Sequence, residues 1–123
     1  MSTTPEMIDL YFAAWNEPDA AACQRLLEQC WAADSTLISP NGEERGHAAV
    51  SARISAFHTR WPGARVLLAS GIDAHHHILR YGWEIRAADG APLLEGLDVG
   101  EQAEDDRLRR VVMFFGPLPA KTA

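Results

Sequence analysis

The sequence predicts a single α+β domain in which three N-terminal helices pack on an antiparallel sheet, in the order ααβαββββ. Two patterns indicate this fold class. Apolar residues recur at helical spacing through most of the first half of the chain, and large apolar residues alternate with charged ones in the second half. A length of 123 residues suits one core. We expect the domain to occupy residues 1–118 and residues 119–123 to form a loose tail.

The first two helices begin at residues that can cap them. Thr3 or Thr4 precedes Pro5 and Glu6, which suit a first turn with a capping box, and Asp19 can cap the second helix. Each helix then carries one apolar stripe, which predicts one buried face. The stripe of the first helix is Ile8, Tyr11, Phe12 and Trp15, and that of the second is Cys23, Leu26, Leu27, Cys30 and Trp31.

A short strand and a third helix follow. The strand is predicted over 36–39 and ends at a turn that begins with Pro40, after which a charged loop leads to Arg45. Gly46 opens the third helix and Pro62 ends it. Its buried face is predicted to carry Val50, Ile54, Phe57 and Trp61.

Four antiparallel strands are predicted in the remainder, over 64–72, 75–87, 92–104 and 107–116. In the second of these, the odd positions are mostly large and apolar and the even positions are mostly charged, so the odd face should point into the core. That face comprises His77, Leu79, Tyr81, Trp83 and Ile85. The last strand is apolar on both faces, with Phe114 on one of them. So short a chain offers no cover for its second face, and we expect a homodimer through the outer face of the sheet.

Charge and hydropathy exclude several partners. The net charge is −6, and eleven basic residues are scattered among seventeen acidic ones, which argues against nucleic-acid binding. No apolar stretch approaches the roughly 20 residues of a membrane span, and the N-terminus lacks a basic segment leading into an apolar one. We therefore expect a soluble cytoplasmic protein that does not associate with membranes.

One carboxylate interrupts an otherwise apolar segment near the end of the chain. Strand period places Asp98 on the same side as Leu94, Gly96 and Gly100, a face with almost no side-chain bulk. Such a face can line a cavity. A carboxyl group that points into an apolar cavity resists ionisation and can then donate a hydrogen bond.

The order of elements and four short motifs resemble the nuclear transport factor 2-like (NTF2-like) superfamily, and within it the SnoaL-like polyketide cyclases and ketosteroid isomerases. The motifs are residues 11–16 (YFAAWN), 34–40 (DSTLISP), 46–50 (GHAAV) and 105–108 (DDRL). The resemblance covers nearly the whole chain. It implies a cone-shaped fold with a deep pocket between the sheet and the helices, and Asp98 is expected in that pocket.

The resemblance to ketosteroid isomerases also implies roles for individual residues. Tyr11 lies five residues before Asn16, as the oxyanion-binding Tyr of those enzymes does, and Asp98 is similar to their protonated Asp. Their general-base Asp immediately precedes a Pro, whereas Ser39 stands before Pro40 here. A hydroxyl cannot replace a carboxylate base, so this chain departs from the pattern at that position.

His77 is the natural substitute for the missing base, because its predicted face is the inward one and imidazole titrates near neutral pH. A lone His on an apolar face is, however, more often a partly buried residue that bonds a neighbour or a water than a catalytic one. The candidate catalytic residues are thus Tyr11, His77 and Asp98. Pocket residues that would bind the ligand are predicted to be Trp15, Ser39, Phe57, Tyr81, Trp83 and Phe114. For Trp31 and Trp61, at helix ends, a core role is favoured.

No metal and no cofactor are predicted. Asp73, His75 and His77 could be drawn as a site of two His and one carboxylate, but a turn expected at Asp73 would break their common face. Two functions stay open. One is a cofactor-free isomerase, cyclase or hydratase of an apolar carbonyl compound, in which Tyr11 and Asp98 donate to the oxyanion and His77 moves the proton. The other is a dimeric module that binds a ligand or a protein without chemistry.

Overall fold

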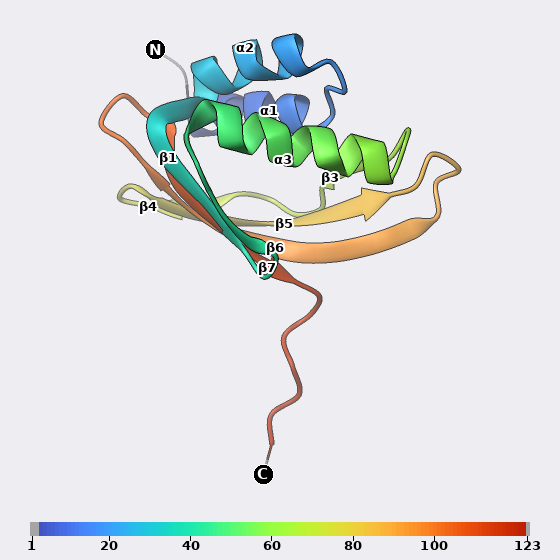
Figure 1. Ribbon diagram of the computed structural model, residues 1–123. Coiled ribbons are helices and arrows are strands. Elements are labelled where there is room, and N and C mark those ends of the chain that lie inside the picture. The colour runs from blue at the N-terminus through green and yellow to red at the C-terminus, as the bar shows by residue number, and fades with distance from the viewer. Residues whose placement is uncertain (1–2, 123) are drawn as a thin grey trace.

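The computed structural model describes residues 3–122, which form three helices against one face of a curved sheet (Figure 1). The helices are α1 (Thr4–Trp15), α2 (Ala20–Cys30) and α3 (Gly46–Arg60). The strands are β1 (Trp31–Ser39), β2 (Gly42–Arg45), β3 (Arg65–Leu68), β4 (Asp73–His75), β5 (Ile78–Arg86), β6 (Pro92–Gln102) and β7 (Leu108–Phe115). The α+β prediction and the predicted order of the helices and long strands are confirmed.

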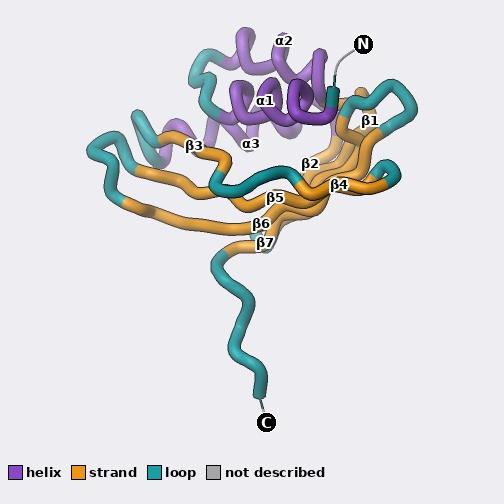
Figure 2. Tube along the Cα trace, turned by 180° about the vertical axis from the view of Figure 1, so that it is seen from behind, coloured by secondary structure: helices purple, strands orange, loops and turns teal. Residues whose placement is uncertain are grey.

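The strands form a seven-stranded sheet with the order β2-β1-β7-β6-β5-β3, and β4 pairs with β5 outside this path. β5, β6 and β7 make the predicted antiparallel meander, whereas β1 runs parallel to β7. Seen from behind, all three helices lie on the same side of this sheet, and the segment after β7 leaves on the other side (Figure 2). Within residues 3–122, no helix is both long and apolar enough to cross a membrane.

The helix ends follow the local sequence signals. The Thr3 hydroxyl accepts a hydrogen bond from the Glu6 amide, and the Asp19 carboxylate accepts one from the Ala22 amide, so both predicted N-caps are confirmed. α2 ends one residue earlier than predicted, and Trp31 is the first residue of β1 rather than part of the helical stripe. The charged segment that ends at Arg45 is not a loop, because it pairs with β1 as strand β2.

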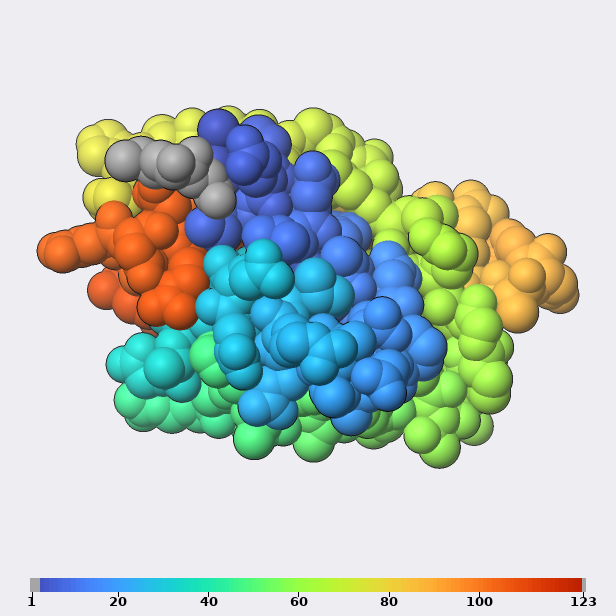
Figure 3. Space-filling view, turned by 90° about the horizontal axis from the view of Figure 1, so that it is seen from above, coloured from blue at the N-terminus to red at the C-terminus, as the bar shows by residue number. Residues whose placement is uncertain are grey.

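The core lies between the helices and the sheet. Its largest fully buried side chains come from both layers and include Tyr11, Leu27, Trp31, Leu37, Leu79 and Tyr81. Seen from the helix side, α1 and α2 cover the middle of the sheet, and the gold hairpin between β5 and β6 projects beyond them (Figure 3). Burial of these apolar groups is the main force that holds the helices on the sheet.

The glycines that flank Asp98 in strand period leave no empty face, which corrects the prediction of a cavity above them. A side chain at Gly96 would overlap the Trp83 ring and the Phe114 carbonyl oxygen, and one at Gly100 would press on Leu79. The glycines therefore make room for the large side chains of the neighbouring strand β5, and Trp83 can lie flat across β6.

We predict that Gly96→Ala destabilises the protein by about 1–3 kcal/mol or more, because the added methyl group must displace a ring and a backbone carbonyl. Urea unfolding would measure the loss. Gly71→Ala is the matched control, since a methyl group there meets no atom within 4 Å, and its effect should stay within about 0.5 kcal/mol. Equal stability of the two variants would contradict the close packing at Gly96.

Candidate functional site

Asp98 lies at the centre of the candidate site, on the face of β6 that points to the helices. The residue is 3% exposed. The Tyr81 hydroxyl donates a hydrogen bond of 2.7 Å to its Oδ2 atom, and the Trp83 Nε1–H donates one of 2.7 Å to its Oδ1 atom. Tyr81 stands directly across from Asp98 on β5, and Trp83 follows two residues later on the same face. Each carboxylate oxygen therefore has one donor from the adjacent strand.

Burial and these two hydrogen bonds act on Asp98 in opposite directions. Removal from water penalises the charged form and is the larger effect, while Tyr81 and Trp83 stabilise the carboxylate and lower the pKa. The balance raises the pKa of Asp98 to about 7. Both protonation states are therefore populated near neutral pH, which suits a group that takes up and releases a proton.

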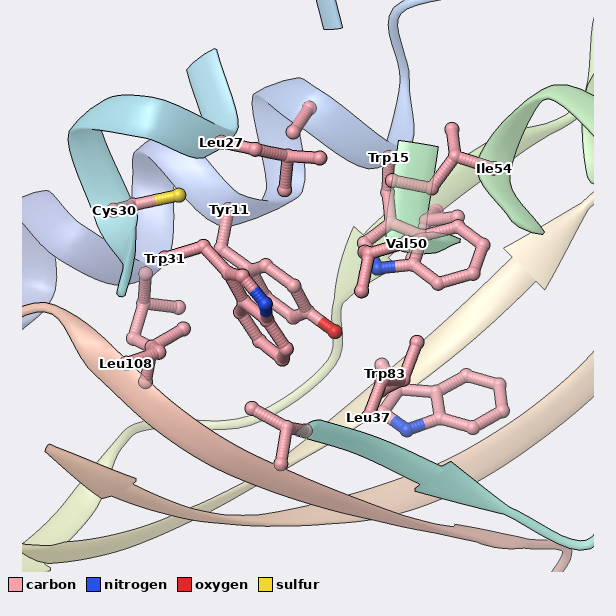
Figure 4. Close-up of a cluster of buried hydrophobic side chains, with 14 of the residues drawn as sticks. Tyr11, Trp15, Leu27, Cys30, Trp31, Leu37, Val50, Ile54, Trp83 and Leu108 are labelled. Carbon is pink, nitrogen blue, oxygen red and sulfur yellow. The ribbon is translucent and has the colours of Figure 1, made fainter. Parts of the chain in front are cut away.

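Tyr11 projects toward the same region from α1. It is 1% exposed, and its hydroxyl oxygen is buried without a hydrogen-bond partner. Burial, followed by the nearby charge of Asp98, raises the pKa of Tyr11 well above its ordinary value, so the hydroxyl keeps its proton. Figure 4 shows the hydroxyl directed toward the space between Trp15 and Trp83. A buried hydroxyl without a partner is a ready donor to an oxygen atom of a ligand.

Two contacts fix the position of Tyr11. Its ring stacks on Trp31 at a centroid distance of 5.4 Å and an interplanar angle of 10°. At the end of α1, the Asn16 amide group donates to the Val66 carbonyl at 2.8 Å and accepts from the Val66 amide at 2.7 Å. This pair of hydrogen bonds ties α1 to β3. Sequence reasoning noted Asn16 only as a spacing marker, although a polar residue directly after an apolar stripe could have suggested such a contact.

Two adjoining hollows surround these residues. The inner cavity has a volume of about 20 Å³ and is lined by Tyr11, Phe12, Trp15, Val66, Trp83, Ile85, Asp98 and Met113. The outer cavity has about 350 Å³ and shares four of those residues, Trp15, Trp83, Ile85 and Met113. The inner volume suits one water-sized group, and the outer volume is in the range of small-molecule pockets. A ligand body in the outer cavity could thus direct its carbonyl end toward Tyr11 and Asp98.

Several predicted pocket residues occupy this site. Trp15 and Trp83 line both cavities, and Phe57 lines the outer one, where it packs edge-to-face on Trp15 at 5.8 Å. Tyr81 lines neither cavity, and its hydroxyl donates its hydrogen bond to Asp98. Trp61, for which a core role was favoured, is 41% exposed and lines the outer cavity.

Two predicted ligand-binding residues lie elsewhere. Phe114 is 54% exposed on the outer face of the sheet, because strand alternation turns its neighbours Met113 and Phe115 toward the helices. The prediction assigned it to the wrong face for a pocket residue. Ser39 lines neither cavity, and its hydroxyl accepts a hydrogen bond from the Asn41 amide at 3.2 Å within the turn after β1.

The prediction that His77 faces the core is also wrong. The strand expected over 75–87 is interrupted by a turn at His76 and His77, and His76 has a φ of 56°. This left-handed residue breaks the alternation, so the inward parity of Leu79 does not extend back to His77. His77 is exposed and lines neither cavity, which removes it as the proton carrier of this site.

The turn expected at Asp73 is strand β4, where Asp73 pairs with Arg80 on β5 through an ion pair of 2.8 Å. In the described part of the chain, no group of three or more His, Cys, Asp or Glu side chains is arranged to hold a metal ion.

Comparison with solved structures identifies the family. A candidate isomerase of the SnoaL-like family from Agrobacterium tumefaciens strain C58 is 30% identical, and the match covers 95% of this chain and 100% of that one with a TM-score of 0.87. This chain belongs to the SnoaL-like family. The resemblance deduced from the sequence motifs is thereby confirmed. No protein-family model and no curated protein matches the chain.

Two more distant structures share the fold of this SnoaL-like protein. A candidate polyketide cyclase from Sinorhizobium meliloti is 13% identical, with 92% of this chain and 100% of that chain covered and a TM-score of 0.71. A protein with a ketosteroid isomerase-like fold from Catenulispora acidiphila, in complex with trimethylamine, is 14% identical, with coverages of 91% and 86% and a TM-score of 0.71. At these identities the likeness concerns the fold alone.

The raised pKa of Asp98 predicts a pH dependence of stability. Between the ordinary pKa of 3.8 and the folded value of about 7, the folded state binds more protons than the unfolded one. Stability from this group should therefore fall as pH rises from about 4 to about 7, by on the order of 4 kcal/mol, and change no further above that.

Urea unfolding of the wild type and Asp98→Asn across this pH range would isolate the effect. The stability difference, wild type minus variant, should decrease from pH 4 to pH 7. The control variant Asp9→Asn, on the exposed face of α1, should keep the wild-type dependence. A difference between wild type and Asp98→Asn that does not vary with pH would contradict the raised pKa.

Proposed function

We propose that this SnoaL-like protein is a cofactor-independent enzyme that moves a proton next to the carbonyl group of an apolar compound, and so isomerises or cyclises it. The observation that carries the proposal is the buried Asp98 carboxyl group, with a pKa of about 7, in a cavity that it shares with the unpaired Tyr11 hydroxyl. The SnoaL-like candidate isomerase at 30% identity supports the same reaction class.

Each residue has a defined role in this proposal. Ionised Asp98 takes a proton from the carbon next to the carbonyl group, and the electrons of that C–H bond form the C=C bond of an enolate. Tyr11 donates a hydrogen bond to the enolate oxygen, where the negative charge develops. Protonated Asp98 then returns the proton to a different carbon. In a cyclisation, the enolate carbon instead attacks a second carbonyl group, whose π electrons pass to its oxygen, and Asp98 gives its proton to the resulting alkoxide. Asp98 thus takes the task first expected of His77, which is exposed in a turn.

Exchange of the α-protons of 2-tetralone in D2O, followed by proton NMR, would test this chemistry without the physiological substrate. The wild type should accelerate exchange above the buffer rate, and the rate should rise with pH through about 7 as Asp98 ionises. Asp98→Asn should abolish the acceleration, and Tyr11→Phe should lower it by about 10²-fold. Asp9→Asn should retain the wild-type rate, and a wild type no faster than buffer would refute the proposal.

A non-catalytic binding module is the second candidate. It is favoured by the placement of Ser39 and His77 outside both cavities, which leaves Asp98 as the single carboxylate or imidazole among the described lining residues. Binding of 2-tetralone, measured by quenching of tryptophan fluorescence, together with exchange at the buffer rate, would support this reading.

We also propose that the protein forms a homodimer through the outer face of its sheet. Phe114 is 54% exposed there, and Leu118, just after β7, is 90% exposed. Both line an open hollow of about 620 Å³ together with Leu97 and Gly82. Burial of this apolar surface against the same surface of a second copy would be favourable and would satisfy two-fold symmetry.

Phe114→Glu should convert the dimer into a monomer, because it would bury two carboxylates at the two-fold interface. Sedimentation velocity would measure the change. Leu68→Glu is the matched control. Leu68 is 41% exposed, and it pairs directly with Trp83, which faces the helices, so Leu68 lies on the helix side of the sheet. A carboxylate there lies outside the proposed interface, and the dimer should persist. A wild type that sediments as a monomer would rule out the proposed interface.

A further inference from the structure

The outer cavity carries positive charge on its α3 wall, and this charge bears on what the cavity binds. Two guanidinium groups, Arg53 and Arg60, line it, and no Asp or Glu among residues 3–122 does. They are seven residues apart on α3, hence two turns apart on one helix face, with Phe57 between them. These two positive charges line one cavity of a chain whose net charge is −6.

Neither arginine is fully engaged by the protein. The Nε atom of Arg53 lies 3.3 Å from the Glu44 carboxylate, but it is buried without a hydrogen-bond partner. Glu44 therefore neutralises part of the charge of Arg53 without using the donors of its fork. Arg60 lies over the Trp61 ring at 5.0 Å, and no carboxylate in residues 3–122 is within ion-pair distance of it.

The rest of the outer cavity is apolar and aromatic. Trp15, Phe57 and Trp83 supply flat surfaces, and Ile85, Leu93 and Met113 complete the wall toward the sheet. Tyr11 and Asp98 line the adjoining inner cavity, which shares four wall residues with the outer one. The site thus combines a hydroxyl donor and a carboxyl group in the inner cavity with apolar walls and two guanidinium groups, spaced along α3, in the outer one.

We infer that the ligand is a ring-containing keto acid, with its carbonyl oxygen at Tyr11 and its carboxylate at Arg53 and Arg60. A guanidinium fork matches the two oxygens of a carboxylate, and charge-assisted hydrogen bonds are stronger than neutral ones. The two guanidinium groups would also attract an anionic ligand to the cavity, although the chain as a whole is negatively charged. The position of the carbonyl group rests on the proposed function, whereas the carboxylate contact stands on the arginines alone.

A matched pair of probes tests the carboxylate contact. The first probe is 6-carboxy-2-tetralone, which carries a ketone and a carboxylate at opposite ends of two fused rings, and the second is its neutral methyl ester. Isothermal titration calorimetry should give at least about tenfold tighter binding of the acid to the wild type. This preference should weaken as salt concentration rises, since Arg60 is exposed to solvent.

Variants assign the preference to the two arginines. Arg60→Gln should reduce it, and the double variant Arg53→Gln with Arg60→Gln should abolish it with little change in the affinity for the ester. Arg53→Gln leaves Glu44 without its ion-pair partner, so Arg53→Lys is included as well. Lysine keeps the positive charge but lacks the two parallel donors of a guanidinium group, and this variant should retain part of the preference. Arg25→Gln, exposed on α2 and outside both cavities, is the control for net charge and should bind as the wild type does.

The outcomes separate this inference from the proposed function. Preferential binding of the acid that depends on Arg53 and Arg60 supports the inference, even if α-proton exchange stays at the buffer rate and the catalytic proposal fails. Equal binding of acid and ester, binding of neither, or a preference that the arginine variants leave unchanged would overturn the inference. Accelerated exchange of 2-tetralone would still support catalysis in each of those cases.

Discussion

The buried carboxyl group of Asp98 is the constraint on which the arrangement of the site depends. A carboxylate removed from water is costly unless its oxygens accept hydrogen bonds, and here each oxygen has one donor, from Tyr81 and from Trp83. Both donors come from β5, so the register between β5 and β6 has to be kept. Gly96 contributes because its missing side chain leaves room for the Trp83 ring. The packing of the Trp83 ring against Gly96 and the hydrogen bond that Trp83 donates to Asp98 therefore depend on the same register.

Helix α1 supplies the second side of the site, and two contacts hold its C-terminal end in place. The two-way hydrogen bond between Asn16 and the Val66 backbone fixes the end of α1 against β3, and this attachment holds Tyr11 and Trp15 over Asp98. A second contact serves the same end of the helix, since a ring nitrogen of His58 on α3 lies 2.8 Å from the Trp15 carbonyl oxygen. The hydroxyl donor thus stands on a rigid element, as a preorganised site requires.

The sequence predicted most where its pattern was long and regular. Alternation from Leu79 to Ile85 was sufficient to bring Tyr81 and Trp83 to the inner face, and the period of β6 gave the direction of Asp98. It failed at His77 because one residue with positive φ, His76, resets the parity. Histidine adopts this conformation more readily than most residues, but a run of three histidines does not say which of them does so. It failed at the glycines because an empty strand face and a face filled by a neighbouring strand look alike in one dimension.

The proposed chemistry follows from the single candidate proton carrier, Asp98, among the described residues that line the two cavities. Hydration of a double bond requires one group to activate water and another to protonate the carbon, whereas a proton shift needs one base that takes a proton and returns it. Asp98 has a pKa of about 7, so near neutral pH a large fraction of it is ionised and able to take a proton, and Tyr11 keeps its own proton. The proposed function therefore names isomerisation and enolate cyclisation and leaves out hydration. A ligand whose carboxylate binds Arg53 and Arg60 would be held in one orientation, and this orientation would determine which carbon atom faces Asp98.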